Sequence, residues 1–461
     1  MNIVYLAIYF LIIFVATLFV KSVNSKDYFL LGNRNVNATP MAFSIASTWV
    51  WAPALFVSAE QAYTNGWVGL FWFTVPNVLC LLLFIPFAKS LRDRMPRGYT
   101  LSEYMGDKYS KRVKGVYLFQ LSSLSLLSTV VQLLAGGKVI TLMTGIPFWL
   151  TTLILGLFAF SYSFRSGLRA SVMTDSLQLI FILCSLFIVV SWVLGITGFE
   201  SLSNGALGAK ESRLGFLDSN GMHVMLSFGI PTTIALLSGP FGDQNFWQRA
   251  LSVKKEKLTL AFVLSAVLFA CVPILMGSLG FIARGIGITD ADSSIINLVL
   301  VEDLLPAWTS IFFIFIILSG LLSTINSNLS SMSSLANDII RNANLKKLRL
   351  SMLVLTIVSV ALSNIPVSII DFFLFYGILR ATTFATTTLT LSGVTLRERG
   401  VFYGVIGSLV VGFPTFIYGS VAGNTALKLT GSVLALALSG IIAILMTKVG
   451  AKFDTKKENV H

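Results

Sequence analysis

A run of hydroxyl side chains interrupts an apolar part of the chain near residue 320. The stretch LSGLLSTINSNLSSMSSLANDIIR (318–341) follows the run IFFIFII (311–317), which is typical of a helix inside a membrane. Five of its serines recur at helical spacing on one face, the serine stripe: Ser319, Ser323, Ser327, Ser330 and Ser334. Hydroxyl groups facing lipid would cost free energy. Close helix packing and a site for a hard, singly charged cation explain the stripe equally well on this segment alone.

Two other apolar segments carry helix breakers near their centres. AFSIASTWVWAPALF (42–56) contains Pro53, and GIPTTIALLSGPFGDQNFWQR (229–249) contains two prolines and three glycines. A helix broken at membrane depth exposes carbonyl groups that only a cavity, water or an ion can satisfy. An ordinary proline kink would explain either segment by itself. Two breaks five spans apart favour two five-helix repeats with a binding site at their interface.

The composition predicts an all-α, polytopic membrane protein that the lipid bilayer surrounds. The chain has 461 residues, of which 55% are hydrophobic and 11% charged, whereas about a quarter of the residues in a soluble protein carry charge. We expect about thirteen transmembrane helices. Their ranges are 3–20, 39–63, 67–89, 116–143, 147–165, 171–198, 222–248, 257–284, 304–340, 350–365, 368–396, 400–420 and 426–448.

Basic residues are distributed unevenly between alternate loops. Of the 33 Lys and Arg residues, 27 fall in one set of loops, which includes the segments 21–34, 89–114 and 448–457. Positive charge gathers on the cytoplasmic side of membrane proteins, so this pattern predicts an external N-terminus and a cytoplasmic C-terminus at the cell membrane. The net charge of +13 is then a topology signal, and no nucleic-acid partner is expected.

The sequence offers little for metal-centred or acid–base catalysis. It has two histidines, and its three cysteines (Cys80, Cys184 and Cys271) lie far apart in apolar segments without zinc or disulfide spacing. It contains no GxxxxGK[ST] phosphate loop. We therefore expect neither an enzyme nor a pump driven by ATP through such a loop.

Several short segments between about residues 27 and 400 resemble motifs of the sodium:solute symporter family, in the family's order. They are DYFLLGNRN (27–35), STWVWAPALF (47–56), AYTNGW (62–67), GLRASVMTDSLQ (167–178), FGDQNFWQRA (241–250) and GLLSTINS (320–327). The tryptophan-rich STWVWA and the following GLFWF (69–73) look most like the urea and polyamine branch.

The resemblance implies the leucine-transporter-type fold, with a core of two inverted repeats of five helices. The chain would then divide into four parts. They are an extra N-terminal helix and loop (1–38), the first repeat (39–221), the second repeat (222–399), and two C-terminal helices with a short tail (400–461).

The resemblance also implies a sodium ion, Na+, between the first and eighth core helices. Its ligands would be the carbonyl groups of Ser47, Val50 and Gly320 and the hydroxyl groups of Ser323 and Thr324. All five are neutral oxygen donors beside a helix break.

A second cation, found in only some members, would lie one turn further along the eighth helix. Its ligands would be Asp175, Asn326 and Ser327, together with Ser323. The alternative is that Asp175 forms a salt bridge with Arg165 or Arg169.

The substrate site implied by the resemblance lies between the broken helices and the third and tenth core helices. The candidate residues are Thr48, Trp51, Ala54, Gln132, Asp243, Gln244 and Arg380. Arg380 departs from the urea branch. It either holds a carboxylate of the substrate, or it forms a structural pair with Asp243, Glu60 or helix carbonyls.

These features together predict a secondary active transporter. We expect a sodium-coupled symporter that imports a small polar organic solute by alternating access and functions as a monomer. The solute would be a small carboxylate if Arg380 binds it, and urea-like and neutral otherwise. The rival hypotheses on the same fold are a proton-coupled symporter, for which Asp175 is the one titratable candidate, and an uncoupled channel.

Overall fold

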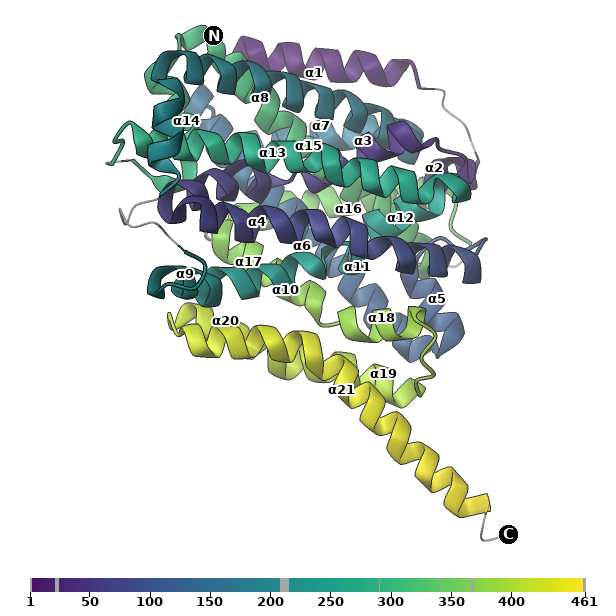
Figure 1. Cartoon of the computed structure of the whole chain (residues 1–461). Coiled ribbons are helices and arrows are strands. Elements are labelled where there is room, and N and C mark those ends of the chain that lie inside the picture. The colour runs from purple at the N-terminus through teal and green to yellow at the C-terminus, as the bar shows by residue number, and fades with distance from the viewer. Residues whose placement is uncertain are drawn as a thin grey trace.

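The computed structural model describes residues 2–20, 25–207, 215–289, 291–340, 342–365 and 369–458. Over these residues the fold is a bundle of helices, with one isolated β-bridge and no β-strand. Most of the long helices run roughly alongside one another, with α1 along one side of the bundle and α21 along the opposite side (Figure 1). The predicted all-α class is confirmed.

The bounds of the helices are as follows. They are α1 (Asn2–Leu18), α2 (Lys26–Leu31), α3 (Ala38–Trp49), α4 (Ala52–Arg94), α5 (Leu101–Lys108), α6 (Lys111–Thr144), α7 (Phe148–Ser166), α8 (Leu168–Gly205), α9 (Ser219–Val224), α10 (Ile230–Leu237), α11 (Gly239–Gly242), α12 (Gln244–Ser252), α13 (Leu258–Gly285), α14 (Ile296–Leu304), α15 (Ser310–Ile339), α16 (Leu345–Ser363), α17 (Ile369–Ala381), α18 (Phe384–Leu391), α19 (Glu398–Gly407), α20 (Phe413–Val421) and α21 (Thr425–Glu458).

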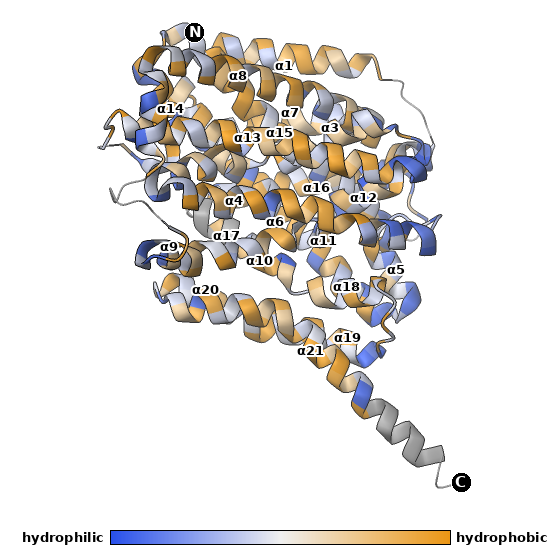
Figure 2. Ribbon diagram, viewed as in Figure 1, coloured by the Kyte–Doolittle hydropathy of each residue, from blue (hydrophilic) through white to orange (hydrophobic). Residues whose placement is uncertain are grey.

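The distribution of apolar residues is that of a membrane protein. In the described part of the chain, nine helical segments are long and apolar enough to cross a membrane, by length and composition. Apolar residues dominate the middle of the bundle, and the most polar segments gather toward the ends of the helices (Figure 2). The described residues of the remaining predicted spans, at 3–20, 39–63, 350–365 and 368–396, are mostly helical as well, but in helices that are broken, shorter or more polar.

The first predicted break lies between α3 and α4. Val50 and Trp51 are the two residues outside both helices. Pro53 lies in the first turn of α4, where its missing N–H is not needed. Further along α4, Gly66 has a non-helical backbone with φ of +60°. The two halves of α4 therefore correspond to the end of the predicted span 39–63 and to the span 67–89.

The second predicted break lies at Asp243, between α11 and α12, where the backbone is extended. Two glycines bring it close to other elements. A Cβ atom at Gly239 would lie 2.3 Å from the ring of Trp49 at the end of α3, and one at Gly242 would lie 2.8 Å from the side chain of Arg380 on α17. The two broken helices therefore meet near their breaks.

The end of the bundle that holds α2 and α5, the predicted cytoplasmic end, is closed by backbone hydrogen bonds. Val36, before α3, forms an isolated β-bridge with Val253, after α12. The N–H of Val36 donates to the carbonyl of Ser252 over 3.1 Å, and the N–H of Lys254 donates to the carbonyl of Val36 over 2.9 Å. The start of α3 and the end of α12 are thus joined at this end of the bundle.

The serine stripe on α15 is buried against other helices. All five of its serines are at most 1% exposed. Ser319 shares a hydrogen bond of 3.0 Å with Tyr9 of α1, and Tyr9 also accepts one from Gln178 of α8 over 3.2 Å. The N-terminal helix α1 therefore contributes a fully buried side chain to the interior of the bundle.

Candidate functional site

The break between α3 and α4 is held open by a glutamine. The N–H of Ala52 finds no helical partner, because α4 begins there, and it donates to Oε1 of Gln132 on α6 over 2.9 Å. The Nε2 group of Gln132 donates to the carbonyl of Ser128 on the same helix. The side-chain oxygen of Gln132, a predicted substrate ligand, is therefore already hydrogen-bonded to the backbone of the broken helix in this conformation.

The hydroxyl groups of α15 lie directly against this break. Ser47 donates to the hydroxyl of Ser323 over 2.8 Å, and Thr324 donates to the carbonyl groups of Thr48 and Gly320, each over 3.1 Å. All of these side chains are at most 3% exposed.

A glycine allows the two elements to come this close. A Cβ atom at Gly320 would lie 3.1 Å from the carbonyl oxygen of Val50. The structure therefore brings together all five residues predicted for the first sodium ion. They offer hydroxyl and carbonyl oxygens without a charged group, which is a donor set for a hard monovalent cation that binds reversibly.

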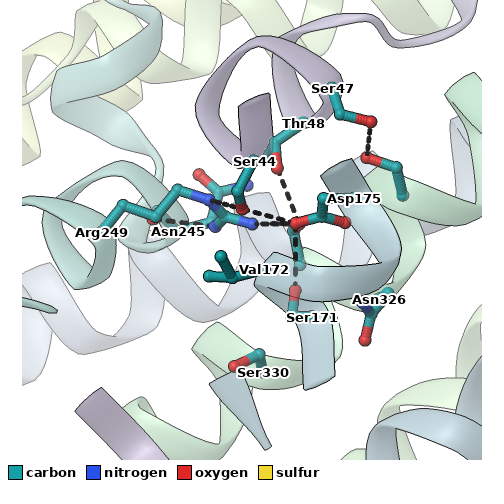
Figure 3. A network of polar contacts seen from close by, with 12 residues as sticks. Ser44, Ser47, Thr48, Ser171, Val172, Asp175, Asn245, Arg249, Asn326 and Ser330 are labelled. Atoms are coloured by element: carbon teal, nitrogen blue, oxygen red, sulfur yellow. Dashed lines mark hydrogen bonds and ion pairs between the residues drawn. The ribbon is translucent and has the colours of Figure 1, made fainter. Parts of the chain in front are cut away.

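The residues predicted for a second cation are only partly together. The guanidinium of Arg249 donates to Asp175 on α8 over 2.9 Å (Figure 3). It also donates to Ser327 on α15 over 2.5 Å. The side chain of Asn326 turns away from this group. It accepts a hydrogen bond from Ser163 of α7 and donates one to Thr174 of α8.

The predicted alternative, a salt bridge from Asp175 to Arg165 or Arg169, is wrong. The partner is Arg249, which lies one residue past the predicted span 222–248 and was therefore expected in the loop that follows it. Arg169 instead donates to the carbonyl of Gly32 over 2.9 Å. The misassignment arose because α12 continues to Ser252, so that Arg249 lies inside a buried helix and not after it. The apolar residues Ala250 and Leu251 that follow it were the available signal.

Arg380 forms a buried ion pair with Asp243. Its Nε donates to Oδ1 of Asp243 over 3.1 Å, its Nη2 contacts Oδ2, and the hydroxyl of Tyr376 donates to both carboxylate oxygens over 2.8 and 2.9 Å. The guanidinium also lies over the rings of Trp49 and Trp51, 5.4 and 5.1 Å from their centroids. Its Nη1 is buried and has no hydrogen-bond partner among the described residues.

The remaining predicted substrate residues are distributed as follows. Trp51 packs against Tyr376, and Ala54 is buried nearby in the first turn of α4. Thr48 shares a hydrogen bond of 2.8 Å with Ser327, so its hydroxyl points toward α15 and the residues predicted to bind cations. Gln244 reaches away from the others, toward the backbone of Tyr99 and Leu101 at the start of α5.

Sequence reasoning missed two side chains that complete these networks. Tyr376 lies one helical turn before Arg380 on α17, and Ser44 lies one turn before Thr48 on α3. In both cases the spacing from a selected residue was the available signal.

Residues 28–407 of the chain match the sodium:solute symporter family. The chain belongs to the sodium:solute symporter family. This member of the family is therefore grouped with transporters and not with enzymes, as the sequence analysis expected. It is an integral membrane protein of a family that carries small solutes.

Two relatives that the chain matches are distant from it in sequence. The probable urea active transporter 3 of Schizosaccharomyces pombe is 22% identical over 281 residues, which cover 58% of this chain and 42% of that protein. The sodium/pantothenate symporter of Haemophilus influenzae is 26% identical over 440 residues, which cover 89% of each. The chain spans only 39–42% of the length of the S. pombe urea transporters that it matches.

The fold of this symporter also occurs in a solved transporter structure. A Na+-coupled sialic acid symporter, in a substrate-bound outward-open state, superposes with a TM-score of 0.77. The two are 16% identical, and the match covers 96% of this chain and 98% of the other. This likeness supports the predicted transporter fold.

Proposed function

We propose that this protein is a sodium-coupled symporter that imports a small, polar, uncharged solute by alternating access. The observation that carries the proposal is the contact between the α3–α4 break and α15. There Ser323 accepts a hydrogen bond from Ser47, and Thr324 donates one to the carbonyl of Thr48. A Cβ atom at Gly320 would lie 3.1 Å from the carbonyl oxygen of Val50. One sodium ion moving across ~100 mV would supply ~2.3 kcal/mol, enough for roughly 50-fold solute accumulation from voltage alone.

We infer that the solute is uncharged because Arg380 is already paired with a carboxylate of the protein. Asp243 already balances its charge, and Tyr376 donates to the same carboxylate. A carboxylate solute would have to enter beside Asp243, where two like charges repel in a region of low dielectric. A urea-like solute carries amide groups that can form hydrogen bonds without adding charge. The S. pombe relatives named as urea transporters agree with this choice.

A carboxylate solute is the second candidate, because Nη1 of Arg380 is buried without a hydrogen-bond partner among the described residues. One N–H could still bind one carboxylate oxygen. Coupling to protons would need Asp175 to gain and lose a proton, although Arg249 neutralises it in this conformation.

The test is solute uptake into proteoliposomes that hold the purified protein. An inward sodium gradient is expected to drive accumulation of radiolabelled urea, and replacement of external sodium by potassium is expected to abolish it. Uptake that is independent of sodium but is driven by an imposed pH gradient would overturn the proposed coupling to sodium. Accumulation of lactate in preference to urea would overturn the uncharged solute. Sodium flux without any dependence on solute would identify a channel.

A further inference from the structure

A groove on the outside of the bundle runs along α6, α15 and α16. It has a volume of about 610 Å³, and apolar side chains form most of its wall. Phe119 of α6, Ile339 of α15 and Val354 of α16 line it, and each of the three is more than half exposed. The three helices thus leave a hollow whose apolar side chains are not covered by any described part of the protein.

The groove is as long as one leaflet of a bilayer is thick. On α16 its wall extends from Lys347 to Val358, which is about 16 Å along a helix axis. The hydrocarbon core of a bilayer is about 30 Å thick, so one leaflet contributes about 15 Å. An extended fatty acyl chain would therefore fit along the groove with its head group at the level of Lys347.

Lys347 places a positive charge at one end of this groove. It lies in the first turn of α16, is exposed, and forms no ion pair among the described residues. Asp338 of α15 does not balance this charge, because it is 3% exposed and pairs with Lys114 of α6 over 3.8 Å. The described wall of the groove carries no acidic side chain. An apolar wall with a positive end matches a molecule that has an acyl chain and a negatively charged head group.

We propose that this groove binds one anionic phospholipid of the surrounding bilayer, with an acyl chain along α16 and the phosphate at Lys347. Other basic residues gather at the same end of the bundle, and they also attract anionic lipids. Lys346, the neighbour of Lys347, lines a different hollow together with Lys26 of α2. The place of Lys347 on the groove wall therefore distinguishes it from an adjacent residue of equal charge.

The bound lipid would contact the helix that carries the serine stripe. Met332 and Ala336 of α15 line the groove, whereas Ser330 and Ser334 accept hydrogen bonds from Gln248 of α12. Residues two apart in a helix point to nearly opposite sides, so the lipid and α12 lie on opposite faces of α15. A lipid that binds this folded arrangement stabilises it.

The experiment measures lipid binding to the purified full-length protein in detergent. Native mass spectrometry is expected to show one retained dioleoyl phosphatidylglycerol in preference to dioleoyl phosphatidylcholine. The anionic lipid is also expected to raise the melting temperature more than the zwitterionic one does. Equal retention of the two lipids would overturn the inference. Neither sodium nor solute is needed, so this outcome is separate from that of the proposed transport function.

Matched variants test the place of binding. Lys347→Gln is expected to lower the affinity for phosphatidylglycerol about fivefold, whereas Lys346→Gln removes the same charge outside the groove and should change it much less. Val354→Trp fills the groove from an exposed position and is expected to abolish retention of the lipid. Equal losses in both lysine variants would reveal general attraction to this end of the bundle and overturn the inference. A dimer that dissociates in Val354→Trp would assign the groove to a second copy of the chain and overturn it too.

Discussion

Ser323 is the side chain on which the proposed first sodium site depends most directly. It is fully buried and accepts a hydrogen bond from Ser47 across the interface between α15 and α3. Thr324 beside it donates to a backbone carbonyl of α3. A sodium ion that enters here would exchange these hydrogen bonds for contacts with the same oxygens, which is why neutral donors can both bind and release it.

Replacement of Ser323 by alanine should weaken sodium binding. Removal of one neutral oxygen ligand costs about 1 kcal/mol, so the sodium concentration for half-maximal uptake is expected to rise about five- to tenfold. Ser333→Ala is a matched control, because Ser333 is equally buried on α15 and donates only to the carbonyl of Ser330 on its own helix. An equal effect of both substitutions would remove the special role of Ser323.

Arg380 and Asp243 should depend on each other for stability. Loss of one partner leaves a buried charge, which typically costs about 3–5 kcal/mol, so Arg380→Gln is expected to lower the melting temperature of the purified protein. The double variant Arg380→Gln with Asp243→Asn should recover much of that loss. If the solute is uncharged, the double variant should also still bind urea in a thermal-shift assay. A solute carboxylate held by Arg380 would instead make both variants inactive toward it.

At the scale of elements, the site exists because a broken helix and a continuous helix approach closely. The break offers backbone carbonyls, and α15 offers hydroxyls from successive turns. Gly320 sets the distance between them, since a side chain there would meet Leu55 at 2.8 Å and the carbonyl of Val50 at 3.1 Å. Gln132 holds the first N–H of α4 and so fixes the shape of the break.

Replacement of Gly320 by alanine should therefore impair sodium binding through spacing alone. The added methyl group has to displace the Val50 carbonyl or push α15 away, and loss of one well-placed oxygen predicts about a tenfold rise in the half-maximal sodium concentration. Gly115→Ala serves as the control, since Gly115 is an exposed residue of α6 with open space around its Cβ position. An unchanged sodium dependence in Gly320→Ala would argue against an ion between these elements.

The two helix breaks and the serine stripe were predictable from sequence because each depends on local chemistry. Proline and glycine interrupt a helix wherever they occur, and period-four hydroxyls share a face in any helix. The partners of Asp175 and Asn326 were not predictable in this way, because they depend on how α7, α8, α12 and α15 are rotated against one another. For the same reason the contact of Gln244 with the start of α5 was not foreseen.

At the scale of the whole molecule, the basic residues suggest how the bundle lies in the membrane. Lys89 and Arg92 near the end of α4 lie close to Lys255, which pairs with Asp93. This is the end at which Val36 and Val253 form their β-bridge. We expect that end to face the cytoplasm.

Orientation can be tested with single cysteines. Thr395 precedes α19 and Ala422 follows α20, and both residues are exposed. In a background without Cys184 and Cys271, a membrane-impermeant maleimide applied to intact cells is expected to label Ala422→Cys and to leave Thr395→Cys unlabelled until the cells are opened. The reverse pattern would invert the predicted topology.

The buried Tyr9 constrains how the protein is assembled during synthesis. Its partners Gln178 and Ser319 are separated from it by 169 and 310 residues, so α1 leaves the ribosome long before either partner exists. The hydroxyl of Tyr9 therefore lacks these two hydrogen-bond partners in the bilayer until α8 and then α15 are inserted. Docking of α1 is then completed late in biogenesis, after the helix that carries the serine stripe has been inserted.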